Sequence, residues 1–148
     1  MTHRSLLHRL LATMLLVFFL AACGASGGSD AAPARNAPAT IRFAEQQADG
    51  IHGWLAASAA PATGTANVDA YLEGADGQPI ANATVTFDVD MTNMSHGKTL
   101  VTTRTMGDGH YAGDVHFMMP GPWRIIAMVE RPGQAPVQLH FEFQVQTP

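Results

Sequence analysis

Hydrophobic and polar residues alternate along most of the chain after residue 50. The clearest run lies near the end, where apolar side chains occupy every odd position from Val137 to Val145 and polar side chains separate them. Shorter runs alternate in the same way, and turn signals such as Asp49-Gly50 and Asp108-Gly109 divide them. A period of two residues is typical of a strand with one buried face, and turns between short runs favour an antiparallel arrangement.

This pattern predicts seven strands in a domain of about 100 residues, which is typical of an all-β, immunoglobulin-like antiparallel Greek-key sandwich. Trp123 belongs to the inward set of its strand and is expected to anchor the core. The expected strands cover residues 51–57, 66–72, 82–90, 98–105, 110–117, 123–130 and 137–146.

The first 40 residues follow a different pattern. Arginines flank the start of an apolar run over residues 10–22, which is too short to span a bilayer comfortably. The run ends in Leu20-Ala21-Ala22-Cys23, which resembles the lipobox of a bacterial lipoprotein signal peptide. That resemblance implies removal of residues 1–22 and acylation of Cys23.

Residues 24–40 are rich in Gly, Ser, Ala and Pro, a composition typical of a flexible tether. We therefore expect a signal peptide over 1–22, the lipidated cysteine and its tether over 23–40, and one folded domain over 41–148. The expected protein is an exported, membrane-anchored lipoprotein on the periplasmic face or the cell surface.

Composition narrows the possible functions. Cys23 is the only cysteine, so the mature domain has no disulfide, zinc–thiolate site or cysteine nucleophile. Removing residues 1–22 takes away two arginines and lowers the formal charge from −4 to about −6, which argues against nucleic acid as a partner. The sequence shows no recognisable catalytic triad, pair of buried carboxylates or phosphate-binding loop, so we expect no enzyme activity.

Methionine and histidine gather in two short segments, one after the strand at 82–90 and one at the end of the strand at 110–117. Successive strands of the sandwich reverse direction, so both segments are expected at the same end of the domain. The residues expected there are Met91, Met94, His96, His116, Met118 and Met119. The residues expected nearer the opposite end are His52, Met106, His110 and His140.

Thioether sulfur suits Cu(I), and imidazole accepts copper in either oxidation state. We expect a copper site, with Cu(I) favoured, in which Met91, Met94 and His96 are completed by His116 or Met118.

Outward-pointing Asp88 and Asp90 would draw cations towards the same end of the domain. Two other interpretations of the methionines stay open. The Met-bearing loop could be a hydrophobic contact patch for another protein, and Met119 could be a lid over the core, packed on Trp123 or Phe117.

From about Gly50 to the end, the chain resembles YtkA-like and FixH-like domains, which are small bacterial β-sandwiches of exported and membrane-anchored proteins. The resemblance rests on several phrases of the sequence together with the closing alternating strand. The phrases are Val68–Leu72, Asp76–Val85, Asp90–His96, Gly107–Tyr111 followed by Val115, and Met119–Trp123. It implies a β-sandwich associated with copper handling, with a copper-transport or oxidase-assembly protein as a possible partner. The lipobox stands where FixH proteins usually have a transmembrane helix, which favours the YtkA-like group.

Overall fold

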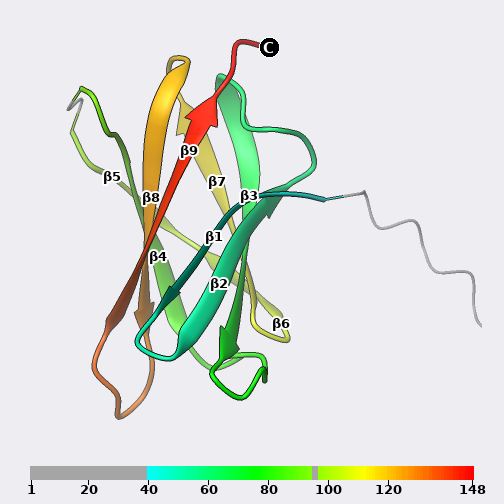
Figure 1. Ribbon diagram of the computed structural model, residues 1–148, viewed down its shortest axis with the longest axis vertical. Coiled ribbons are helices and arrows are strands. Elements are labelled where there is room, and N and C mark those ends of the chain that lie inside the picture. The colour runs from blue at the N-terminus through cyan, green and yellow to red at the C-terminus, as the bar shows by residue number, and fades with distance from the viewer. Residues whose placement is uncertain (1–39, 95–96) are drawn as a thin grey trace, which may run out of the picture. The chain divides into compact units, whose positions relative to one another are not determined.

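The computed structural model describes residues 40–94 and 97–148, which form an all-β domain without helices (Figure 1). The predicted signal peptide, Cys23 and most of the tether lie outside these residues. Within the described part of the chain, no helix is long and apolar enough to cross a membrane. The strands are β1 Ile41–Ala48, β2 Ile51–Ala57, β3 Gly64–Gly74, β4 Thr84–Met91, β5 Thr99–Thr102, β6 Arg104–Gly107, β7 His110–Phe117, β8 Gly121–Glu130 and β9 Val137–Val145.

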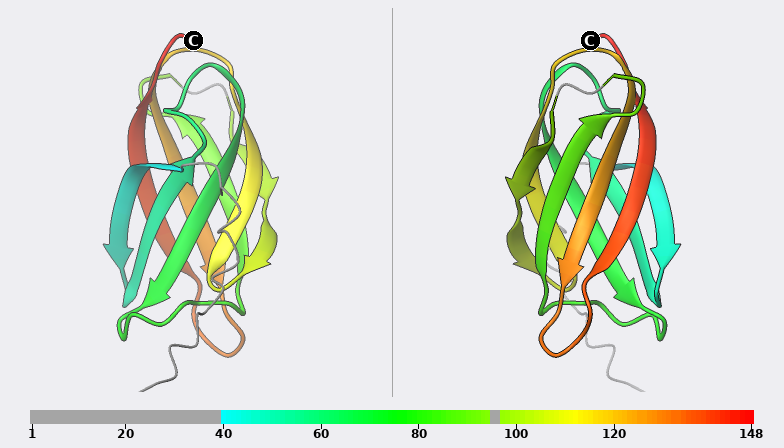
Figure 2. Two further views of the ribbon diagram at one scale, coloured as in Figure 1. Left: turned by 90° about the vertical axis from the view of Figure 1, so that its right-hand side faces the viewer. Right: turned by 90° about the vertical axis from the view of Figure 1, so that its left-hand side faces the viewer.

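The strands form two antiparallel sheets that pack face to face as a sandwich (Figure 2). The five-stranded sheet has the order β1-β2-β3-β7-β6, and the four-stranded sheet has the order β5-β4-β8-β9. Strands β2-β3-β7-β6 and β4-β8-β9 reproduce the two sheets of an immunoglobulin constant-type domain. The predicted fold class is therefore confirmed, although the described residues contain more strands than the seven expected.

The core lies between the sheets and is built from the inward residues of the alternating runs. Phe87, Tyr111, Phe117 and Phe141 are among the largest fully buried side chains. Trp123 is 4 % exposed, as its predicted role of core anchor requires. The buried Tyr111 hydroxyl donates a hydrogen bond of 2.6 Å to the Ile80 carbonyl, so its polar group is satisfied inside the core.

Strand β1 is the first difference from the prediction. It pairs with β2 through a hairpin at Asp49-Gly50, where both residues have positive φ, as a tight two-residue turn requires. A register shift between Arg42 and Ala44 breaks the alternation within the strand. Few of its side chains are covered, so the sequence lacks the apolar period that would predict a strand.

The predicted strand over 98–105 is the second difference, because it divides between the two sheets. Strand β5 pairs with β4 in the four-stranded sheet, and β6 pairs with β7 in the five-stranded sheet. The chain crosses at Thr103, whose hydroxyl donates to the Val85 carbonyl at 2.7 Å. Beside the crossing the packing at Gly113 is close, because a Cβ there would lie 3.1 Å from Val101 Cγ1.

The divided segment still carries the chain from one end of the sandwich to the other. The loops 58–63 and 118–120, and the described residues 92–94 and 97–98 of the loop after β4, therefore lie at the end where the chain terminates, at the top of Figure 1. We call this end the rim. The turns at 49–50 and 108–109 lie at the opposite end, as predicted (Figure 1).

Candidate functional site

A cavity of about 220 Å³ opens at the rim, where the ends of β4, β5 and β7 approach one another. It is shaped by both sheets, because β4 and β5 belong to one sheet and β7 to the other. The cavity, which we call the rim pocket, is lined by Val89, Asp90, Met91, Gly97, Thr99, His116, Met118 and Trp123. Three of the five predicted metal ligands, namely Met91, His116 and Met118, thus line one cavity.

Met91 reaches the pocket from the core and not from a polar loop, which corrects our expectation. It is the last residue of β4, continues the inward set of Val85, Phe87 and Val89, and is 4 % exposed. Its backbone N–H donates to its neighbour Asp90 at 2.8 Å. Glycine at position 121 leaves room for the Met91 methyl group, because a Cβ there would lie 3.1 Å from Met91 Cε. A thioether held in this way has little freedom to move.

His116 and Met118 come from the end of β7, where they take the two outward positions on either side of buried Phe117. Met118 is 57 % exposed, so its thioether is accessible from solvent. Nδ1 of His116 lies 3.1 Å from the hydroxyl oxygen of Thr65, which is its cross-strand neighbour on β3. Sequence reasoning missed Thr65, because nothing local to residue 65 indicates that it lies beside His116.

The back wall of the pocket is aromatic and fixed in place. The indole N–H of Trp123 donates to the Met119 carbonyl at 3.0 Å, and its ring meets Phe117 edge-on with 5.2 Å between ring centroids. Met119 is partly buried and packs against the core, in agreement with its interpretation as a lid. These contacts attach the 118–120 turn to the core, so the pocket wall formed by Trp123 is held in place.

The two aspartates near the pocket have different environments. Asp88 is only 8 % exposed and lies 3.1 Å from Lys98 Nζ, which corrects our expectation of an open, cation-attracting carboxylate. The pair connects the end of the 92–98 loop to β4. Asp90 lines the pocket itself, so one of the two expected carboxylates lies beside the soft ligands.

The remaining two predicted ligands are not part of the pocket wall as described. Met94 lies in the loop after β4, is 46 % exposed and does not line the cavity. His96 lies outside the described residues. The place of Met94 and His96 in the ligand set stays a prediction, while Met91, His116 and Met118 line the described pocket.

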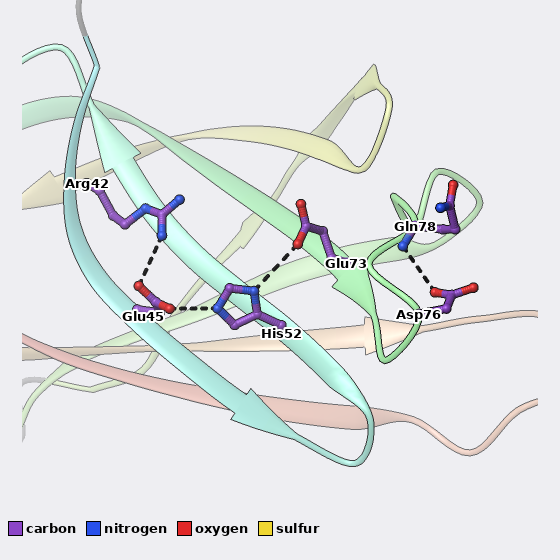
Figure 3. A network of polar contacts seen from close by, with 6 residues as sticks. All are labelled: Arg42, Glu45, His52, Glu73, Asp76 and Gln78. Atoms are coloured by element: carbon purple, nitrogen blue, oxygen red, sulfur yellow. Dashed lines mark hydrogen bonds and ion pairs between the residues drawn. The ribbon is translucent and has the colours of Figure 1, made fainter.

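The outer face of the five-stranded sheet holds a second group of histidines, which sequence reasoning set aside. His52 lies between two carboxylates, with Nε2 at 2.7 Å from Glu45 and Nδ1 at 3.6 Å from Glu73 (Figure 3). Glu45 is also bound by Arg42 at 3.0 Å. The hydrogen bonds from His52 and then from Arg42 lower the pKa of Glu45 below its ordinary value of 4.5.

Aromatic rings stack across the same face. Trp54 and Tyr71 are nearly parallel with centroids 5.3 Å apart, and Tyr71 stacks on His110 at 4.5 Å. The Arg42 guanidinium lies 4.2 Å from the Trp54 ring centre, and Asp69 binds His110 Nε2 at 2.7 Å. Burial raises the pKa of Tyr71, and the charge of Asp69 adds to this shift. We call this row of rings the outer ladder.

The donor chemistry of the rim pocket suits a soft monovalent metal. Two thioethers and one imidazole are ligands that Cu(I) accepts, whereas Zn²⁺ prefers thiolate, imidazole and carboxylate. Among the described residues, no group of three or more His, Cys, Asp or Glu side chains is arranged to hold a metal ion.

The fold and the pocket define a small immunoglobulin-like β-sandwich with a methionine- and histidine-lined cavity at one end. A family model described as YtkA-like matches residues 45–128, which is more than half of the chain, and the protein belongs to that family. No curated protein and no solved structure matches the sequence. The YtkA-like resemblance seen in the sequence is thus confirmed.

Proposed function

We propose that this protein is a lipid-anchored, non-enzymatic extracytoplasmic module that binds Cu(I) in the rim pocket and passes it on. The observation that carries the proposal is that Met91, His116 and Met118 all line one cavity of about 220 Å³. Such a set matches the softness of Cu(I) without using thiolate. A site of this kind would exchange its ion with a partner, and copper would be a cargo.

The residues divide into two roles. Met91, His116 and Met118 would hold the ion, because they line the pocket. Met94 and His96 would act earlier, as capture residues of the 92–98 loop. Asp90 adds negative charge to the pocket wall and would raise the local concentration of cations.

The cellular setting follows from the N-terminal segment. The lipobox resemblance at Leu20–Cys23 supports export and attachment to a membrane through a lipid on Cys23. A copper-transport or oxidase-assembly protein on the same membrane face is the kind of partner that would receive the ion, in line with the FixH-like features of the sequence.

A second function is favoured by the exposure of the methionines. Met94 and Met118 are 46 % and 57 % exposed, and exposed methionines are common on surfaces that bind other proteins. In this case the rim would be a contact patch of a structural or interaction domain. Leucine would replace methionine in such a patch at small cost, but it has no sulfur with which to bind copper.

The test is an anaerobic Cu(I) titration of the purified full chain, without a histidine tag, against a chromophoric chelator. Wild type is compared with Met91→Leu, Met118→Leu and His116→Ala, and Met106→Leu serves as the control because Met106 is exposed at the opposite end. We expect wild type and the control to retain one Cu(I) and the other variants to lose it. A wild type that retains no copper, or three variants that retain it unchanged, would overturn the proposal.

A further inference from the structure

His116 has one partner that the proposed copper site does not use. Its Nδ1 lies 3.1 Å from the Thr65 hydroxyl, and the two residues are directly opposite each other on β7 and β3. The pair is held by the strand register and not by a loop. Threonine is β-branched and has few side-chain rotamers, so the hydroxyl has a defined position.

The Thr65 hydroxyl can accept from Nδ1–H or donate to a bare Nδ1, and the direction of this hydrogen bond determines which ring nitrogen can bind a metal. A neutral imidazole carries one proton, and only the nitrogen without it has a lone pair to offer. When Nδ1–H donates to the Thr65 oxygen, the lone pair is on Nε2. Metal-binding histidines usually have their tautomer and ring orientation fixed in this way by a second partner.

The kind of partner also sets how strongly the imidazole binds. A carboxylate partner makes the ring a better electron donor and strengthens its bond to the metal. His110 has such a partner in Asp69, at 2.7 Å. His116 has a neutral hydroxyl as its partner, at Nδ1, which orients the ring without the added donor strength. A weaker bond between the imidazole and the metal would favour release of the ion.

We propose that Thr65 is a positioning residue of the rim pocket, which holds His116 in the tautomer that presents Nε2 to Cu(I) and keeps the bond weak enough for transfer. This inference rests on the proposed copper function. Loss of the hydrogen-bond partner of a metal-binding histidine typically lowers metal affinity about 10- to 100-fold, and a charged partner in its place raises the affinity.

Three variants test the proposal in the full chain. Thr65→Val keeps the shape of the side chain and removes the hydroxyl, so Cu(I) affinity should fall about 10- to 100-fold. Thr65→Ser keeps the hydroxyl and should restore most of the affinity. Thr65→Asp should bind Cu(I) more tightly than wild type. Thr105→Val makes the same change in β6 of the same sheet and should have no effect.

A second measurement separates this proposal from the copper function. Long-range ¹⁵N–¹H spectra of the metal-free protein report the tautomer of the His116 ring, which should be the Nδ1–H form in wild type and should change in Thr65→Val. If wild type binds no Cu(I) but the tautomer changes as expected, the copper function fails and only the control of the His116 tautomer by Thr65 survives. If wild type binds Cu(I), and Thr65→Val changes neither affinity nor tautomer, the positioning role is overturned.

Discussion

His110 and His116 stand on the same face of β7, and each contacts a residue of β3, yet their surroundings differ in kind. His110 is bound by the Asp69 carboxylate at 2.7 Å and stacks on Tyr71. His116 is hydrogen-bonded at Nδ1 to the hydroxyl of Thr65 and lines the rim pocket together with Met91 and Met118. A carboxylate and a stacked ring make a histidine part of the scaffold, whereas a hydroxyl and a cavity leave it able to bind a ligand.

The comparison extends to the groups to which the two histidines belong. The outer ladder ties β1, β2, β3 and β7 together through ring stacking, ion pairs and the Arg42–Trp54 contact. The rim pocket instead gathers side chains from both sheets around an open space. We therefore expect changes in the ladder to alter stability and changes in the pocket to alter copper binding, with little crossover.

The largest expected effect is the loss of copper binding in His116→Ala. Removing a ligand should lower Cu(I) affinity by more than the loss of the ligand's hydrogen-bond partner does, which is roughly 100-fold at most. His110→Ala and His52→Ala should leave the Cu(I) affinity unchanged, because both residues lie on the outer face of the five-stranded sheet and neither lines the rim pocket. Chelator competition measures all three, and an equal loss in His110→Ala would break the distinction between the two groups.

The next effect is the loss of stability in Trp54→Ala. Trp54 stacks on Tyr71 and receives the Arg42 guanidinium, and these two contacts together contribute about 2 kcal/mol. The free energy of unfolding should fall by that amount in urea denaturation, while Cu(I) affinity stays the same. Met118→Ala should show the reverse, since exposed Met118 contributes less than about 0.5 kcal/mol to stability.

The smallest effect concerns acid pH and is confined to the outer face. Hydrogen bonds from Asn67 and Arg104 lower the pKa of Asp114 below its ordinary 3.8, as His52 and Arg42 do for Glu45. A carboxylate with a lowered folded-state pKa adds stability above its unfolded-state pKa and loses it as pH falls through the folded-state value. Stability should therefore decline below about pH 4.5. Thermal unfolding of Glu45→Gln should show a shallower decline, and identical pH profiles would contradict this assignment.

The alternation of hydrophobic residues was enough to predict the sandwich, because each strand with one buried face carries its own period of two. It also placed Met91 at the right end of the domain, although the inward set of Val85, Phe87 and Val89 would have placed it in the strand as well. Strand β1 was missed because its register shift and mostly exposed side chains leave no alternation of buried and exposed positions in the sequence.

The site was only partly predictable, because its details depend on residues far apart in the sequence. Strand reversal was sufficient to bring Met91, His116 and Met118 to one end. The pairing of Thr65 with His116 depends on the register between β3 and β7, and the Lys98–Asp88 pair depends on how the 92–98 loop returns. Neither the register nor the path of the loop leaves a local signal in the sequence.

The central claim is that the rim pocket binds Cu(I) through methionine sulfur and the imidazole of His116. X-ray absorption at the copper edge of the Cu(I)-loaded full chain tests it most directly. We predict sulfur scatterers together with imidazole nitrogen in the first shell, with the imidazole contribution lost in His116→Ala and the sulfur contribution reduced in Met91→Leu. A first shell of nitrogen and oxygen alone, or a spectrum unchanged in both variants, would contradict the claim.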